Sequence, residues 1–238
     1  MTRALQPSTA TLLTFRAPPV NLSSATVQIM RIAIPRKTVY RLSVYLRCLT
    51  QFAENGVHMA SSHALAQAAG VKPTQLRKDL TSFGHFGTRG VGYDVETLRE
   101  GITEALGRKQ LQPVVLVGVG HLGSALLAYR GFANENFEIV AGFDVDVQRK
   151  RRKTYSQPIL PLDKLKSFVR SRKIRMAVIA VPSSAAQDVA NRLIAAGVTA
   201  LLNFAPIVLH VPGKVVVNNV NLANELENLS YFRSLAEG

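Results

Sequence analysis

The chain has 238 residues, of which 47% are hydrophobic, and carries a formal net charge of +14. This composition supports a substantial core, but no apolar run approaches the ~20 residues of a membrane span, and a single cysteine, Cys48, excludes an intrachain disulfide and cannot bind zinc alone. Since no apolar signal segment opens the sequence, we expect a cytoplasmic protein, whose basic charge favours a polyanionic partner, DNA or RNA ahead of a membrane surface.

The N-terminal stretch, residues 1–33, is rich in Ser, Thr, Ala and Pro, and its first 31 residues include no acidic one. It shows little sustained periodicity, which predicts a disordered and mildly basic tail. A translation start at Met30 would remove most of it.

Helix-turn-helix organisation is expected next, over about residues 45–84. Apolar residues at helical spacing predict a first helix from Thr38 onward. Ser61 and Ser62 form a capping signal for a short helix over residues 63–69 that Gly70 stops, and Thr74 is expected to cap a second helix reaching about Phe83. These helices and their turn match the motif that places a recognition helix in the major groove of DNA.

The second helix carries polar and basic residues near its start that can reach base edges and phosphates: Thr74, Gln75, Arg77 and Lys78. Residues 83–93 are punctuated by glycine and predict a short β-hairpin, the wing of a winged helix. In that wing Arg89, beside Gly90, can enter a narrow minor groove. A helix over residues 95–106 and a polar linker at residues 107–109 complete a domain spanning residues 34–107. An ordinary small helical domain with a charged face is the alternative.

A second domain, residues 108–218, opens on a buried parallel strand at residues 113–117. Gly118, Gly120 and Gly123 follow at the G-x-G-x-x-G spacing, and a helix continues from them. In that strand–turn–helix context the glycines permit a tight turn, close approach of the backbone to a pyrophosphate, and close helix–strand packing. The free N–H groups at the new helix's N-terminus favour phosphate binding.

An acidic residue, Asp144, ends the next predicted strand, residues 137–143, about twenty residues beyond Gly123. A carboxylate there accepts a hydrogen bond from the ribose 2′-OH and repels a 2′-phosphate, which favours NAD(H) over NADP(H). The basic run Arg149–Lys153 that follows is interpreted first as a solvated loop. Phosphate contacts to DNA and a partial shift toward NADP(H) stay open as alternatives.

Regular alternation of strands and helices continues, with strands predicted at residues 174–181, 199–203 and 214–217 and a helix up to Ala196. Because ligands bind at the carboxyl edge of such sheets, we expect Pro182 and Phe204, which follow two of these strands, near the cofactor. A final helix at residues 221–235 carries an apolar stripe that needs a partner, either this chain or a second protomer.

Catalytic groups of a dehydrogenase are hard to find. His210 is the only histidine after Asp144, and His121 lies in the glycine turn, where its backbone matters more than its ring. Little chain remains beyond the sheet for a substrate domain. We therefore expect a protein that senses its cofactor and is not an enzyme, with an NAD-dependent oxidoreductase or a CoA- or nucleotide-binding subunit as alternatives.

Several long motifs in order make the chain, from about Ile34 to its end, resemble the Rex family of bacterial redox-sensing transcriptional repressors. The motifs are Ile34-Pro35 with Thr38 and Arg41-Leu42, Gln75 to Leu80, Phe86 to Tyr93, Gly118 to Gly123, Phe143 to Asp146, Asn203 to Pro206, and Leu229 to Phe232. The implied fold is mixed α/β: an N-terminal winged-helix DNA-binding domain, a Rossmann-like NAD(H)-binding domain, and a C-terminal helix, residues 219–238, swapped between protomers.

The resemblance also implies a function: a homodimer that binds an inverted repeat in promoter double-stranded DNA and is released when NADH binds. Gln75, Arg77 and Lys78 would contact the major groove, and Arg89 with Gly90 the minor groove. The implied dinucleotide residues are Gly118, Val119, Gly120, His121, Leu122, Gly123 and Asp144, with Tyr129 near the nicotinamide.

One residue and one segment depart from the family pattern. Asn221 stands where family members usually carry an aspartate, and its neutral side chain would weaken or retune the redox response. The short adenine-binding loop of the family is replaced by Arg149–Lys153 with Thr154 and Tyr155.

Overall fold

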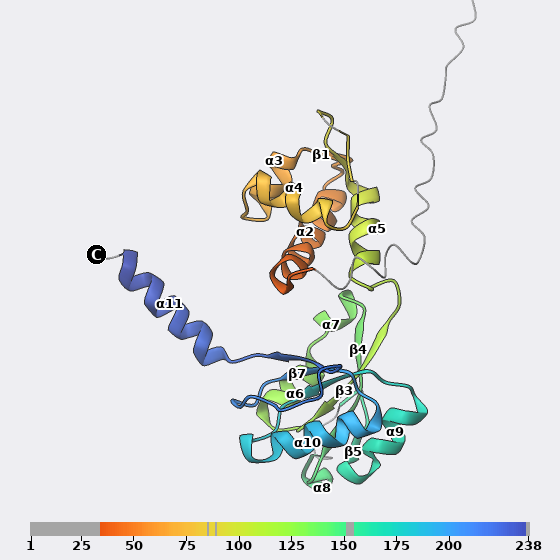
Figure 1. The fold of residues 1–238 in the computed structure, drawn as a ribbon. Helices are drawn as coiled ribbons and strands as arrows, with labels where there is room; N and C mark the ends of the chain where they lie inside the picture. Colours follow the sequence, from red (N-terminus) through yellow and green to blue (C-terminus); the bar gives the residue numbers. More distant parts are fainter. Residues whose placement is uncertain (1–33, 85, 89, 151–154, 237–238) are drawn as a thin grey trace, which may run out of the picture. The chain divides into compact units, whose positions relative to one another are not determined.

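The computed structural model describes residues 34–84, 86–88, 90–150 and 155–236 (Figure 1). The predicted tail, Arg89 and most of the basic run, residues 151–153, lie outside the described residues. Two compact units divide between Leu106 and Gly107, and each is described by itself.

The N-terminal unit is mainly helical. Its elements are α2 (Arg36–Glu54), β1 (Met59–Ala60), α3 (Ser62–Ala68), α4 (Pro73–Thr81), β2 (Tyr93–Asp94) and α5 (Val95–Ala105). Their buried apolar faces form one core, which includes Leu42 and Leu49 of α2, Leu76 of α4 and Leu98 of α5. The helix-turn-helix arrangement predicted from the sequence is present as α3, a turn and α4.

The ends of α3 and α4 follow local rules, with one correction. Ser61 caps α3 by accepting the N–H of Ala64 at 3.0 Å, and Gly70 adopts a left-handed φ of +66° just after the helix. The expected cap at Thr74 is wrong, because the N-cap is Lys72, two residues earlier, and α4 begins at Pro73. Proline suits the first helical position, since its fixed φ is already helical and it has no N–H to satisfy.

The predicted hairpin of the wing is present in minimal form, closed by two backbone hydrogen bonds of 3.1 Å between Thr88 and Gly92. Among the described residues between α4 and β2, Thr88 and Gly92 form an isolated antiparallel bridge. The strand β2 that follows pairs instead with β1, as Met59 opposite Asp94 and Ala60 opposite Tyr93. The end of the glycine-punctuated segment is therefore anchored to the strand before α3.

The C-terminal unit is built on a parallel sheet whose described strands lie in the order β5-β4-β3-β6-β7-β8. Their bounds are β3 Gln112–Val117, β4 Phe137–Asp144, β5 Ile159–Pro161, β6 Met176–Ile179, β7 Ala200–Asn203 and β8 Val216–Asn219. Numbered from the first strand, this is the 3-2-1-4-5-6 order of dinucleotide-binding folds. The order reverses between β3 and β6, where such sheets bind their ligands. The predicted Rossmann-like fold is confirmed.

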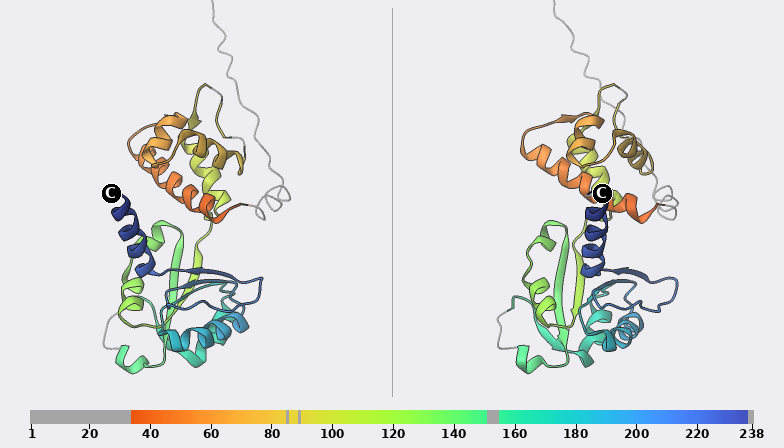
Figure 2. Two further views of the ribbon diagram at one scale, coloured as in Figure 1. Left: turned by 60° about the vertical axis from the view of Figure 1, so that its left-hand side comes forward. Right: turned by 90° about the vertical axis from the view of Figure 1, so that its left-hand side faces the viewer.

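Helices cover both faces of this sheet (Figure 2). On one face α6 (His121–Ala128) and α7 (Gly131–Asn134) contribute Leu127 and Phe132 to a cluster with the strands. On the other, α9 (Leu165–Ser171) and α10 (Ser183–Ala196) form the larger cluster. The remaining elements are α8 (Val147–Lys150), the short η1 (Leu162–Lys164) and α11 (Leu222–Ala236).

Several predicted boundaries change. The strand predicted at residues 174–181 is shorter, because only Met176–Ile179 pairs with β3, and the last strand lies two residues later than residues 214–217. Part of the basic run, Arg149 and Lys150, ends α8 and does not lie in a loop. The predicted polar linker contains a buried residue, Arg108, which forms an ion pair with Glu135.

Candidate functional site

The face of α4 that turns away from the core carries the residues predicted to meet DNA. Leu76 and Leu80 are buried, whereas Thr74, Arg77 and Lys78 are exposed. This alternation follows from helical spacing, since residues 76 and 80 lie one turn apart on the inner side. The described neighbour of Arg89 in the wing, Gly90, is also exposed.

A buried polar network holds α4 against α2, and site prediction from the sequence missed it. The Asp79 carboxylate is 2% exposed and accepts hydrogen bonds from Arg41 at 2.6 and 2.7 Å and from the Tyr45 hydroxyl at 2.8 Å. Gln75, a predicted DNA contact, donates its amide to the same carboxylate at 2.8 Å. A signal was present, because Asp79 is the only acidic residue between Glu54 and Asp94.

The hydrogen bonds of this network change the pKa values of Asp79 and Tyr45. Burial alone would raise the pKa of Asp79, but hydrogen bonds from Arg41, Tyr45 and Gln75 outweigh it and hold that pKa below its usual value. Burial and the hydrogen bond to Asp79 raise the pKa of Tyr45. Asp79 therefore stays ionised, and the network fixes the orientation of α4 against α2.

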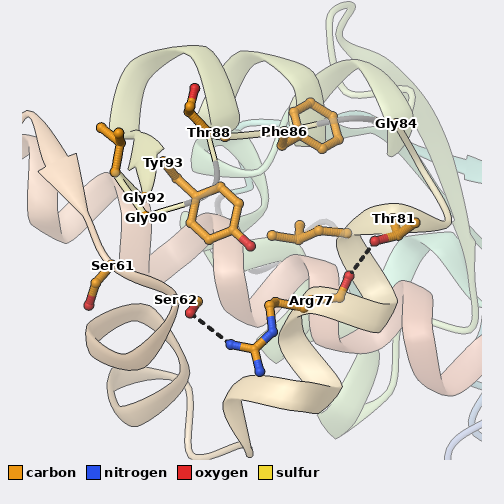
Figure 3. A pocket seen from close by; sticks show the side chains of 13 residues that line it. Ser61, Ser62, Arg77, Thr81, Gly84, Phe86, Thr88, Gly90, Gly92 and Tyr93 are labelled. Atoms are coloured by element: carbon orange, nitrogen blue, oxygen red, sulfur yellow. Dashed lines mark hydrogen bonds between the residues drawn. The ribbon is translucent and has the colours of Figure 1, made fainter.

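A cavity of about 590 Å³ lies between α3, α4 and the wing (Figure 3). Arg77 borders it and donates from Nη1 to the hydroxyl of Ser62 at 3.0 Å. Tyr93, whose pKa is raised by burial and held back by the charge of Arg77, lines the same cavity from β2. Two of the predicted DNA contacts, Arg77 and Gly90, thus line this cavity.

The glycine turn between β3 and α6 is shaped by three different constraints. Gly118 has a φ of +96°, and a Cβ there would collide with the Ala180 carbonyl beside β6. A Cβ on Gly123 would collide with the carbonyl of Gly118. Gly120 has an ordinary φ of −75°, and a Cβ there would meet no atom of the described chain within 4 Å.

The contrast at Gly120 fits a phosphate group. The fold requires Gly118 and Gly123 for its own packing, but it does not require a glycine at position 120. The space that a Cβ would fill lies at the N-terminus of α6, where the first-turn N–H groups of His121, Leu122 and Gly123 have no partner within the helix. These features suit the pyrophosphate of a dinucleotide.

Asp144, at the end of β4, is tied to this turn. Its Oδ2 atom accepts the backbone N–H of Val119 at 2.7 Å, and its Oδ1 atom accepts that of Asp146 at 2.9 Å. Each carboxylate oxygen can accept a second hydrogen bond, so a ribose hydroxyl can still be bound. The side chain of Val119 is buried in the core, and only its backbone belongs to the turn.

Two other predicted ligand residues follow neighbouring strands at the carboxyl edge of the sheet. Pro182 follows β6 and is the N-cap of α10. Phe204 directly follows β7, and its backbone N–H donates to the carbonyl of Ile179 at 2.9 Å. Asn203, buried and absent from the predicted site, holds this edge: its amide donates to the carbonyls of Ala205 and Ile207 at 3.1 Å each. Tyr129, at the end of α6, is 60% exposed and packs on Phe132.

Tyr155, the last residue of the segment that replaces the expected adenine loop, contacts α6. Its hydroxyl lies 2.9 Å from that of Ser124, in the first half of α6. Sequence spacing gave no indication of this contact. Asn221 directly precedes α11, where its side chain accepts the N–H of Ala223 at 3.0 Å.

Within the part of the chain that the structure describes, no helix is long and apolar enough to cross a membrane. No cluster of three or more His, Cys, Asp or Glu side chains there has the arrangement of a metal site.

Two protein families match separate parts of the chain. Residues 33–81 match a family described as the putative DNA-binding protein N-terminus, and residues 109–207 match the CoA binding domain. The first match covers α2 to α4, and the second covers the glycine turn and most of the parallel sheet.

Solved structures similar to this chain extend over both units. A chain described as RSP in complex with β-NAD⁺ and operator DNA is 33% identical with a TM-score of 0.78, the match covering 86% of this chain and 94% of that one. RSP in complex with β-NADH is 31% identical with a TM-score of 0.76, over 86% and 96% of the two chains.

The chain is also similar to curated Rex repressors over most of its length. The redox-sensing transcriptional repressor Rex of Carboxydothermus hydrogenoformans is 48% identical over 83% of this chain and 95% of its own length. The Rex repressor of Streptomyces coelicolor is 46% identical over 86% and 80%. With 46–48% identity over 80–95% of these relatives' lengths, the chain belongs to the Rex family of redox-sensing transcriptional repressors.

Proposed function

We propose that this chain represses transcription by binding operator DNA as a homodimer and leaves the operator when NADH binds. The observation that carries this proposal is the similarity of both units to one solved repressor chain held with β-NAD⁺ and operator DNA. DNA binding is assigned to residues 34–107, dinucleotide binding to residues 108–218 and dimerisation to residues 219–238.

In the DNA-binding part, α4 enters the major groove with Thr74, Gln75, Arg77 and Lys78. Arg77 and Lys78 supply positive charge, which provides salt-dependent affinity for phosphates and, where geometry allows, hydrogen bonds to guanine. Their exposure on α4, opposite its buried leucines, supports this assignment. Arg89 and Gly90 at the wing are assigned to the minor groove.

In the dinucleotide-binding part, the turn from Gly118 to Gly123 holds the pyrophosphate. The open space at Gly120 and the first-turn N–H groups of α6 support this role. Asp144 accepts a ribose hydroxyl and disfavours the 2′-phosphate of NADP(H). Pro182, Phe204 and Tyr129 are assigned to the nicotinamide end, where reduction removes the ring's positive charge and so distinguishes NADH from NAD⁺.

The dimer assignment rests on α11. Its apolar side chains are exposed in the single chain, with Leu226 at 66%, Leu229 at 67% and Phe232 at 64%. A continuous apolar helix face of this kind needs a partner surface. A second copy of the chain, receiving α11 in exchange for its own, supplies one.

A regulator must bind its effector more tightly in one state than in the other. We therefore propose that NADH binds most tightly to the conformation that does not bind DNA. In this proposal the protein acts in the cytoplasm and does not turn over the nicotinamide. A mobility-shift titration on a promoter inverted repeat tests this assignment. NADH should release the operator while NAD⁺ does not, and operator binding that is indifferent to both would overturn it.

A further inference from the structure

One nitrogen of the Arg77 guanidinium, Nη1, is held by a hydrogen bond to the protein. Among the described residues it donates one hydrogen bond, from Nη1 to Ser62 at 3.0 Å, and forms no ion pair with a carboxylate. Arg41 differs, because the Asp79 carboxylate accepts hydrogen bonds from both its Nε and its Nη2 atoms. A guanidinium has five N–H donors, so Arg77 keeps four for another acceptor.

Ser62 is held in place independently of Arg77. The preceding residue, Ser61, caps α3 through the N–H of Ala64, which fixes the first turn that contains Ser62. The two adjacent hydroxyls therefore have separate partners: Ser61 binds the backbone of its own helix and Ser62 binds the side chain of the next one. In Figure 3 the hydrogen bond between Ser62 and Arg77 lies below the ring of Tyr93, and all three residues line the cavity.

Anchoring matters for a long side chain. A free arginine has several rotatable bonds, and binding a base edge in two places requires one defined plane. A hydrogen bond that orients the guanidinium before DNA binds reduces the conformational entropy lost on binding.

From this geometry we infer that Ser62 is a positioning residue for DNA readout: its hydroxyl holds the Arg77 guanidinium in the plane with which Arg77 reads one base pair. Ser62 thereby determines specificity without being the residue that contacts the base. The inference rests on the proposed function, because it takes Arg77 as a base reader.

The experiment uses the full chain and a fluorescent duplex recovered by in vitro selection with the wild-type protein. Anisotropy gives the dissociation constant for that duplex and for each single base-pair change in one half-site. Arg77→Ala identifies the base pair that Arg77 reads. Ser62→Ala should lower discrimination at that same base pair about three- to tenfold, the net effect of one ordinary hydrogen bond.

Three controls separate positioning from general damage. Ser62→Thr keeps the hydroxyl and should retain discrimination, whereas Ser82→Ala removes an exposed hydroxyl bonded to the Lys78 carbonyl and should leave base preference unchanged. Ser62→Ala in an Arg77→Ala background should have no further effect. If Ser62→Ala keeps wild-type preference at the base pair that Arg77→Ala affects, the inference is wrong. If Arg77→Ala itself changes no base preference, the assignment of Arg77 as a reader fails, and the inference fails with it.

Discussion

Val119 donates its backbone N–H to the Oδ2 atom of Asp144 at 2.7 Å, and this joins the glycine turn to the end of the neighbouring strand. The carboxylate thus has two tasks: it holds the turn and, in the proposed function, binds the adenosine ribose. Because β3 and β4 pair as parallel neighbours from Gln112 opposite Phe137 to Val117 opposite Phe143, the sheet itself brings the turn and the carboxylate together.

Substitution of Asp144 should change nucleotide preference. Asp144→Asn removes the charge that repels a 2′-phosphate and weakens the hydrogen bond to ribose, so NADH affinity should fall about tenfold while NADPH affinity falls less. Calorimetric titration of both nucleotides measures the ratio, with Asp146→Asn as the control. An equal loss for NADH and NADPH would show that Asp144 does not select between them.

Two glycines of the turn should behave differently when changed to alanine. Gly120→Ala adds a methyl group in open space, so the folded chain should lose no more than about 1 kcal/mol, the cost of alanine at an N-cap, while NADH affinity falls sharply. Gly123→Ala forces its Cβ into the Gly118 carbonyl and should cost about 3 kcal/mol of stability. Thermal unfolding and NADH titration of both variants test the contrast. It is refuted if Gly120→Ala binds NADH normally.

Acid should weaken the N-terminal unit through Asp79. Its pKa is lower in the folded chain than in the unfolded one, so its contribution to stability is complete above about pH 5 and is lost as the pH falls through the unfolded value near 3.9 and then the folded value.

Asp79→Asn should therefore lower the free energy of unfolding by about 3 kcal/mol at pH 7, because Arg41 then loses the charge that it pairs with. It should also flatten the decline in stability between pH 5 and pH 3. Calorimetric unfolding across that range measures both effects. An unchanged acid decline would mean that other carboxylates cause it.

The exposed face of α11 should control assembly. Leu229→Glu places a charge in the apolar stripe and should convert the proposed dimer to single chains, with a large loss of operator affinity. Glu227→Gln, on the same helix, is the matched control and should remain dimeric. Light scattering measures the mass. A dimeric Leu229→Glu variant would assign dimerisation to another surface.

Sequence patterns located most of what determines the fold. The apolar strand before Gly118, the spacing to Asp144 and the cap at Ser61 are local signals, and each has the expected structure. Short elements such as β5 were missed, because three residues are too few for a periodic pattern.

Contacts between distant residues were beyond sequence reasoning. Arg41 and Asp79 are 38 residues apart, and Ser124 and Tyr155 are 31 apart. Their pairing depends on how α2 packs on α4, and on how the chain returns after α8. No local pattern encodes those distances, and for the same reason the bond between Ser62 and Arg77 became visible only in the folded chain.

If one chain couples NADH binding to operator release, the two ligands must oppose each other's binding. Operator affinity is measured with and without saturating NADH, and NADH affinity with and without saturating operator. The account predicts that each ligand weakens the other by the same factor, of about tenfold or more, and that NAD⁺ does not reproduce the effect. A factor of one in both directions would contradict it.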